Sequence, residues 1–426
     1  MRTVPIYISF FLMLTFLSCE REDQVTKFIN IENSIVNLTD SSSIIIYSNL
    51  ALSVSNLKIG NASGGQALSF SSVNKLSDNI FRAYLSNEEN YEYTTQCGVQ
   101  CIFDEVLYKS AYFQILKPKL DINMLKVEKD EIIYDNSCHA AFTDIIEYDN
   151  SCFVTFREAK RHAPSDESEY GKIIIMNNHN QSWNVIADMV YPGYDLRDPK
   201  LYVIKGNLYI LCGIVKLVDG ELTRCGNAIS RYNGESFGPL EIMSLDTEIP
   251  FWIWRLTESD SKFYGIGYKE GLYPVLFESS DLKEWKSLSE IPIPGVPTEA
   301  DLVVRNNKMN VVIRRDNSTS FFCTADGDYK KWICSDMGVR FESPCIGYID
   351  DNYIIVAGRY RSDGCQETAI LKYCYHTNES KCLYITDNKP SDNAYPGLFI
   401  KYPHLYMSYY EGTQESTRIH YCMLNI

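Results

Sequence analysis

Basic charge, helical periodicity and long apolar segments are all scarce in this chain of 426 residues. Its 40 Lys and Arg are outnumbered by 55 Asp and Glu, and the resulting net charge of −15 argues against binding to nucleic acid. After the first twenty residues, no apolar segment is long enough to cross a bilayer. No Cys pair has the CxxC spacing of a zinc site, so we predict neither a metal nor a cofactor.

Few segments repeat their apolar residues at the helical period. Most are short β-type runs separated by Gly, Asn, Asp or Pro turns. The 31 Tyr and 19 Phe suit β-structure, and aromatic rings are also suited to stacking on sugars. The predicted fold class is therefore all-β.

The first twenty residues have the form of an export signal. A positive start leads into an apolar run, residues 4–17, which ends at Ser18-Cys19. A Cys directly after such a site resembles the lipidated first residue of a mature bacterial lipoprotein. We predict a signal peptide over 1–18, lipidation of Cys19 and a tether over 19–25. The predicted location is the outer membrane or cell surface, reached through the lipid anchor only; an anchor that faces the periplasm and an ordinary signal peptide are the alternatives.

Cysteines also suit an oxidising compartment. Lipidation of Cys19 leaves an odd number of the 14 Cys, so at least one stays unpaired. Three close pairs lie on segments expected to be adjacent strands, where cross-strand disulfides are possible. These pairs are Cys212/Cys225, Cys323/Cys334 and Cys374/Cys382.

An aromatic residue closes a polar, turn-like stretch at intervals of about 50 residues. A period of this length, with about four strands per unit, is typical of a β-propeller, whose blades bury their faces by stacking. The aromatic positions are Trp183, Phe237, Trp285, Trp332 and, more weakly, Tyr384.

Five such units fit between residues 138 and 390, and the tail Tyr395–Asn425 holds about three further strands. A strand from before His139, around Glu131–Tyr134, would complete the last blade. We therefore predict a six-bladed β-propeller over 138–426, with five blades as the alternative. A small N-terminal β-rich domain, together with the ring-closing strand, is predicted over 26–137.

Six segments place charged or aromatic polar residues beside β-runs, where they would face the axis of a propeller. Arg157, Arg314 and Arg359 each end a strand–turn–strand unit, so superposed blades would bring them together. Arg forms bidentate pairs with carboxylates, and a converging set predicts an anionic ligand. Salt bridges between blades are the alternative interpretation.

Several of these segments, in order, resemble the successive blades of sialidase-superfamily propellers. They are FREAKRH, DLRDPKLY, WRLTES, TEADLVV and AYPGLFIKYPHLYMSYYEG, within about 290 residues that begin at Cys138. The resemblance implies a six-bladed propeller with an exo-glycosidase pocket. The Arg-Ile-Pro motif of sialidases is absent, with Phe142-Thr143-Asp144 nearby, and the Asp-box pattern is eroded at Ser279–Trp285.

In sialidases, three Arg hold the sugar carboxylate, a Tyr paired with a Glu is the nucleophile, and an Asp is the acid/base. The resemblance implies Tyr395 or Tyr409 as nucleophile, Glu299 as its partner and Asp144 or Asp198 as the acid. It implies Arg157, Arg314 and Arg359 as the three Arg that hold the carboxylate, with Arg255 as the alternative member. Further substrate-binding candidates are Glu158, His162, Arg197 and Glu342.

The predicted function is a sialidase-like exo-glycosidase that hydrolyses terminal, acidic sugars of surface glycans. Hydrolysis needs two groups that flank the glycosidic bond, and these segments supply several carboxylates. One alternative is a glycan-binding lipoprotein that kept the propeller without catalysis. The other is a structural or protein-binding propeller, which would have no polar cluster at its axis.

Overall fold

A computed structural model of the chain consists of two compact units, Met1–Leu120 and Asp121–Ile426. The residues that it describes are 29–116, except 32–34, 38–42, 51, 54, 56, 62–67, 71 and 85–95, and 124–426, except 180–181, 306, 351–352, 362–366 and 387–391. The predicted signal peptide, tether and lipidation site at Cys19 lie outside the described residues. Within them, no helix has the length and apolar character needed to cross a membrane.

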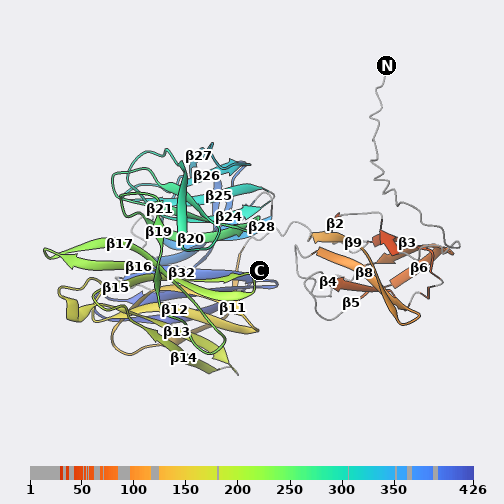
Figure 1. Cartoon of the computed structure of the whole chain (residues 1–426), viewed down its shortest axis with the longest axis horizontal. Helices are drawn as coiled ribbons and strands as arrows, with labels where there is room; N and C mark the ends of the chain where they lie inside the picture. Colours follow the sequence, from red (N-terminus) through yellow and green to blue (C-terminus); the bar gives the residue numbers. More distant parts are fainter. Residues whose placement is uncertain are drawn as a thin grey trace, which may run out of the picture. The chain divides into compact units, whose positions relative to one another are not determined.

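The N-terminal unit contains two sheets, with strand orders β1-β3-β7-β6 and β2-β9-β8-β4-β5 (Figure 1). Ile46 and Phe81 of the first sheet and Ile59 and Val99 of the second belong to one buried core. This unit therefore has an apolar core of its own. Its strands are β1 (Ile29–Ile31), β2 (Ile35–Asn37), β3 (Ser43–Ser48), β4 (Lys58–Asn61), β5 (Leu68–Ser69), β6 (Ser72–Ser77), β7 (Ile80–Tyr84), β8 (Gln96–Phe103) and β9 (Val106–Leu116).

The described strands of the C-terminal unit form three four-stranded sheets, one five-stranded sheet and one eight-stranded sheet. A single parallel pairing, His139 with Thr417, joins two four-stranded halves in the eight-stranded sheet. We therefore divide the unit into six antiparallel four-stranded blades, numbered 1 to 6 in chain order; Figure 1 labels many of their strands. Blade 1 contains β11 (His139–Tyr148), β12 (Ser151–Ala159), β13 (Lys172–His179) and β14 (Ser182–Met189). Blade 2 contains β15 (Asp195–Ile204), β16 (Asn207–Val218), β17 (Glu221–Arg231) and β18 (Glu241–Ile242). Blade 3 contains β20 (Trp252–Ser259), β21 (Lys262–Tyr268), β22 (Val275–Ser279) and β23 (Glu284–Glu290), and β19 (Ser244–Leu245) pairs in parallel with its last strand.

Blades 4 to 6 have the same form. Blade 4 contains β24 (Pro297–Arg305), β25 (Lys308–Arg315), β26 (Phe321–Asp326) and β27 (Ile333–Asp336). Blade 5 contains β28 (Arg340–Asp350), β29 (Tyr353–Arg361), β30 (Glu367–Cys374) and β31 (Glu379–Ile385). Blade 6 contains β32 (Asp392–Lys401), β33 (His404–Gly412), β34 (Thr417–Asn425) and β10 (Lys126–Tyr134).

The outer strand of blade 6 thus precedes blade 1 in the sequence. β10 pairs antiparallel with β34, from Lys126 opposite Asn425 to Tyr134 opposite Ile419. The carboxylate of Asp130 in β10 accepts a hydrogen bond from Tyr409 at 2.8 Å. Because β10 lies beyond Leu120, it belongs to the C-terminal unit. Its main-chain pairing with β34 connects the first strand of this unit to its last strand.

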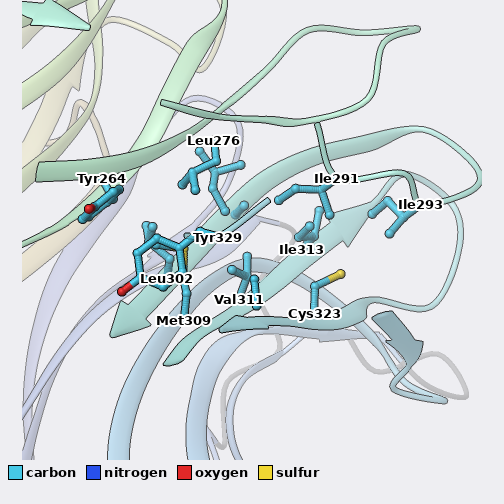
Figure 2. Close-up of a cluster of buried hydrophobic side chains, with 13 residues drawn as sticks. Tyr264, Leu276, Ile291, Ile293, Leu302, Met309, Val311, Ile313, Cys323 and Tyr329 are labelled. Atoms are coloured by element: carbon cyan, nitrogen blue, oxygen red, sulfur yellow. The ribbon is translucent and has the colours of Figure 1, made fainter. Parts of the chain in front are cut away.

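Neighbouring blades bury apolar side chains against each other. Figure 2 shows the cluster in which Tyr264 and Leu276 of blade 3 meet Leu302 and Val311 of blade 4. Further clusters join blades 1 and 2, 2 and 3, 4 and 5, and 6 and 1. Burying a Leu, Val or Ile side chain contributes about 1.5–3 kcal/mol, so stacking of the blades stabilises each of them.

Strand register decides which cysteine pair is bonded. Cys323 in β26 lies opposite Cys334 in β27, and the two form a disulfide. Cys212 lies opposite Ala228 instead, and Cys374 lies opposite Glu379. The predicted candidate pairs Cys212/Cys225 and Cys374/Cys382 are therefore free thiols.

The first strand of every blade has a β-bulge at the matching place, and first strands of successive blades contact one another. Bulges redirect side chains and often adjoin active sites. Asp198, Ser343 and Tyr395 have positive φ angles of 50°, 51° and 44° there. In each blade, two consecutive residues of the first strand have no paired residue on the second strand. These residues are Phe142-Thr143, Asp198-Pro199, Trp254-Arg255, Thr298-Glu299, Ser343-Pro344 and Tyr395-Pro396.

Candidate active site

The bulges of blades 4 and 6 place a tyrosine beside a glutamate. The hydroxyl of Tyr395 donates a hydrogen bond to Oε1 of Glu299 at 2.7 Å. Nη1 of Arg314 lies 2.8 Å from Oε2 of that carboxylate and 3.5 Å from the Tyr395 hydroxyl. Burial, and then the charge of Glu299, raises the pKa of Tyr395 well above its usual value. The phenol therefore keeps its proton unless Glu299 accepts it.

A second guanidinium group, that of Arg359, lies 5.7 Å from the centre of the Tyr395 ring. It is held from blade 5 by Glu342, whose Oε2 lies 3.2 Å from Nη1, and from blade 6 by Asp392 at 3.4 Å. Burial acts to raise the pKa of the Glu342 carboxyl, but Arg314 and other nearby guanidinium groups lower it to about 2. Glu342 therefore stays ionised and positions Arg359.

Asp198 occupies the bulge of blade 2. Burial raises its pKa, although the charges of Arg197 and Lys200 act in the opposite direction. The charge of Asp198 also contributes to the raised pKa of Tyr395, which means that the two groups interact electrostatically. A carboxyl group that holds its proton to higher pH is suited to act as a general acid.

Aromatic rings surround Tyr395. Phe142, at the bulge of blade 1, lies 4.8 Å from it between ring centres, and Trp254, at the bulge of blade 3, lies 5.6 Å away. His162 contacts the edge of Phe142, and the guanidinium group of Arg197 lies 4.9 Å above the same ring. The site thus combines an apolar wall with charged groups.

Asp392 binds two histidines, which is the arrangement closest to a metal site among the described residues. Its Oδ2 lies 3.1 Å from Nε2 of His139 and 3.0 Å from Nδ1 of His162, and all three ligand atoms lie within 4.8 Å of one another. The other oxygen accepts a hydrogen bond from Tyr410 at 2.9 Å and faces the cation of Arg359. Hydrogen bonds from the two imidazoles to Asp392 account for the short distances between these three side chains. The positive charge of Arg359 next to Asp392 disfavours the binding of a divalent cation there.

Two of the predicted site residues lie in a buried ion pair. Asp144 accepts a hydrogen bond from Arg255 at 2.9 Å and another from the main-chain N–H of Leu201 at 2.8 Å. Arg255 also lies 3.6 Å from Asp301. These contacts link the first strands of blades 1, 3 and 4, which leaves Asp198 as the remaining acid candidate.

The third predicted arginine of the triad does not join Arg314 and Arg359. Arg157 is fully buried, and its Nε and Nη2 donate to Oδ1 of Asp195 at 3.0 and 2.8 Å. Burial, and then the charge of Arg197, lowers its pKa to about 10. Strand pairing does not separate Arg157 from Arg359, because each lies opposite the residue just before a bulge. The difference is the partner: Asp195, at the start of blade 2, holds Arg157.

Two further candidates lie away from Tyr395. Tyr409 donates its hydroxyl hydrogen bond to Asp130 in β10 and stacks on His420 with 4.5 Å between ring centres. Glu158 pairs with Lys172 at 3.2 Å and accepts a hydrogen bond from Tyr134. Tyr409 and its neighbour Tyr410 point to opposite faces of β33, and Tyr410 is the one that reaches Asp392.

Sequence reasoning missed several residues of this region, namely Asp392, Tyr410, Trp252, Tyr268 and Arg224. One sequence signal was available for the bulges. Asp198, Ser343 and Tyr395 each precede a proline, and proline in a strand is typical of a bulge. These dipeptides would have indicated the bulges of blades 2, 5 and 6.

No family model matches the chain, and no curated protein matches it. Its structure is similar to the sialidase of Trypanosoma rangeli in complex with the inhibitor DANA, with a TM-score of 0.52 and 11% identity over 71% of this chain and 58% of that one. The same sialidase in its covalent intermediate with 2,3-difluorosialic acid matches with a TM-score of 0.50 and 12% identity over 70% and 59%. The α-L-arabinofuranosidase of Podospora anserina in complex with cellotriose matches with a TM-score of 0.41 and 8% identity over 72% and 99%.

This chain therefore spans 58% of the length of the sialidase that it matches. The likeness shows the fold: the predicted all-β propeller is confirmed, and its structural neighbours are glycoside hydrolases. The role of each side chain rests on the geometry described above.

Proposed function

We propose that this β-propeller is a glycoside hydrolase in which Tyr395 is the nucleophile, Glu299 its base and Asp198 the general acid. The observation that carries the proposal is the 2.7 Å hydrogen bond from the Tyr395 hydroxyl to Glu299. The guanidinium group of Arg314 contacts both of these side chains. A neutral phenol paired with a carboxylate can attack a carbon centre without building up a full negative charge.

In the first step, Oη of Tyr395 forms a bond to the anomeric carbon while its proton passes to Glu299. The bond to the leaving oxygen breaks, and Asp198 supplies that oxygen with a proton. In the second step, ionised Asp198 takes a proton from water, the water oxygen bonds to the anomeric carbon, and Tyr395 leaves and recovers its proton from Glu299. The configuration of the sugar is retained.

The favoured substrate is a terminal acidic sugar. Arg314 and Arg359 are the cations beside Tyr395, in a protein whose overall charge is −15. A charge-assisted hydrogen bond is worth about 1.5–3 kcal/mol, so each contact with a sugar carboxylate would raise kcat/KM about tenfold or more. We also propose that the enzyme works at the bacterial surface, anchored through Cys19.

The test is a panel of chromogenic glycosides that includes sialic acid, uronic acid and neutral sugars. We expect Glu299→Gln to lower kcat by about 10²- to 10⁴-fold, and Tyr395→Phe at least as much. Tyr409→Phe is the matched control, because that hydroxyl binds Asp130. A 2,3-difluoro derivative of the hydrolysed sugar should attach covalently to Tyr395, as peptide mass spectrometry would show.

Full activity of Tyr395→Phe would remove the nucleophile assignment. If the wild type bound glycans but hydrolysed no member of the panel, the protein would be a glycan-binding propeller rather than an enzyme.

A further inference from the structure

The longest hairpin of the propeller, β16–β17 in blade 2, carries an arginine that the reaction above does not use. The ladder pairs Ile214 with Gly226 and Val215 with Arg224, so Cys225 forms a bulge between them. Gly226 has a φ of 122°, a conformation that side chains with a Cβ rarely adopt. The bulge therefore sets the direction of Arg224, and a glycine is needed to make it.

The guanidinium group of Arg224 is held by aromatic rings of blade 3. Its carbon lies 5.3 Å from the ring centre of Trp252 and 4.8 Å from that of Tyr268. The Trp252 ring fits only because residue 213 is glycine: a Cβ there would lie 2.0 Å from it. A further hydrogen bond fixes the hairpin: the main-chain N–H of Leu217 donates to the hydroxyl oxygen of Tyr170 at 2.7 Å.

Arg224 keeps donors for a ligand. Its salt-bridge partner among the described residues is Glu270, whose side chain is 66% exposed and lies 3.3 Å away. Exposed ion pairs of this kind contribute little and exchange readily with solvent. The Arg224 side chain is itself 28% exposed, so a ligand can displace Glu270 without moving the arginine.

Arg224 borders the candidate active site. Its platform, Trp252 and Tyr268, belongs to the same buried cluster as Trp254, against which Tyr395 packs. The charges of Asp198 and Glu299 both act on Arg224. The arginine and Asp198 come from the same blade, whereas Tyr395 and Arg359 come from blades 6 and 5.

We propose that Arg224 binds an anionic group, a carboxylate or a sulfate, on the leaving-group side of the substrate. This inference rests on the proposed function, because Asp198 defines that side by protonating the leaving oxygen. A guanidinium group pre-oriented on two rings offers a bidentate fork to a planar carboxylate or a tetrahedral sulfate. The substrate would then carry negative charge on both sides of the bond that is cleaved.

Two aryl glycosides of the hydrolysed sugar, with and without a carboxylate on the aryl ring, provide the test. In the wild type, we expect the carboxylated compound to have a kcat/KM about tenfold or more higher. Arg224→Gln should bring the ratio of the two values to about one, mainly through KM. Arg231→Gln is the matched control, because Arg231 lies on the same strand but pairs with Asn207 at the surface, and it should keep the wild-type ratio.

A wild-type ratio near one, or a ratio that Arg224→Gln leaves unchanged, would overturn the proposal. Thermal unfolding of both variants shows whether either has lost its fold. If no glycoside is hydrolysed, the proposed function fails, and calorimetry with the same two compounds tests Arg224 separately. Equal affinity of the wild type for both would then overturn the Arg224 proposal as well.

Discussion

At the scale of single residues, Asp198 and Tyr395 are suited to catalysis by their surroundings. Both lie at bulges, and burial raises the pKa of both. A raised pKa makes the carboxyl a proton donor at higher pH and makes the phenol depend on Glu299. The same residue types elsewhere in the propeller, such as Asp144 and Tyr409, are bound to structural partners.

We expect the activity to decline as pH rises through the pKa of Asp198, because the acid must be protonated. Since burial raises that pKa, the decline begins above the range of an ordinary Asp. Asp198→Asn should lower kcat by about 10²- to 10⁴-fold and remove this alkaline decline. The measurement is kcat against pH on an alkyl glycoside, whose leaving group needs a proton.

A glycoside with a dinitrophenyl leaving group provides the control for Asp198→Asn, since that group leaves without protonation. In kcat/KM, which reports the first step alone, the variant should lose much less on this substrate than on the alkyl glycoside. An equal loss of kcat/KM on both substrates would show that Asp198 is not the general acid.

Arg255 illustrates a residue whose role we expect to be structural. Its guanidinium group lies between the carboxylates of Asp144 and Asp301. Burial raises the pKa of Asp301 to about 6, although the positive charge of Arg255 acts to lower it. Arg255→Leu would leave two buried carboxylates unpaired and lower the free energy of unfolding by about 3–5 kcal/mol. Protonation relieves this cost, so the deficit should be smaller at pH 5 than at pH 8.

Urea unfolding at the two pH values measures the effect of Arg255→Leu. Arg231→Leu at the surface is the control and should stay within about 0.5 kcal/mol of the wild type. A deficit that does not change with pH would contradict the charge explanation.

At the scale of elements, the bulge in each first strand links the fold to the site. It lets an otherwise regular antiparallel strand supply one residue of the site, such as Glu299 or Tyr395, and then continue its pairing. The bulges are also tied to each other: Thr143 donates a hydrogen bond to the main-chain oxygen of Tyr395 at 2.9 Å, and the N–H of Ser343 donates to Glu299 at 2.8 Å. The positions of the proposed catalytic residues and the contacts between blades therefore depend on the same segments.

Gly397→Ala tests this dependence. A Cβ at Gly397 would lie 2.4 Å from the main-chain nitrogen of Ile145 and 2.5 Å from Cα of Asp144. Main-chain atoms cannot relieve such a clash by a rotamer change, as a flexible side chain can. We expect a loss of about 1–3 kcal/mol in the free energy of unfolding. Gly238→Ala, where the nearest atom would be 3.7 Å away, is the control; equal stability of the two variants would contradict the expectation.

At the scale of the whole molecule, β10 joins the start of the C-terminal unit to its last blade. A chain that begins at residue 124 keeps this strand, and one that begins at residue 136 loses it. The shorter chain should unfold at lower urea, because β34 loses its partner and the Tyr409 hydroxyl loses Asp130. Coincident unfolding curves for the two chains would show that β10 adds no stability.

The proposed lipid anchor is a property of the complete chain. Cys19→Ala should move the protein from the membrane fraction to the soluble fraction, because the acyl chains supply the membrane affinity. Ser18→Ala, which keeps a small residue before the cysteine, should remain in the membrane fraction. Retention of Cys19→Ala in the membrane would place the anchor elsewhere.

By itself, the sequence determined the all-β class and the propeller, because both depend on local patterns: short β-runs, turn residues and an aromatic period of about 50 residues. It also identified Tyr395, Glu299, Asp198, Arg314 and Arg359 as polar residues at strand ends. It could not separate them from Asp144, Arg157 or Tyr409, which occur in the same kind of segment.

Only the tertiary structure decided between these residues. Arg314 reaches Glu299 and Tyr395, whereas Arg157 is held by Asp195 of the neighbouring blade. These partners are distant in the sequence, with 96 positions between Glu299 and Tyr395 and 38 between Arg157 and Asp195, and no local period records them. Arg224 was missed for the same reason: its rings come from blade 3, and its neighbour Asp198 comes from another strand of blade 2.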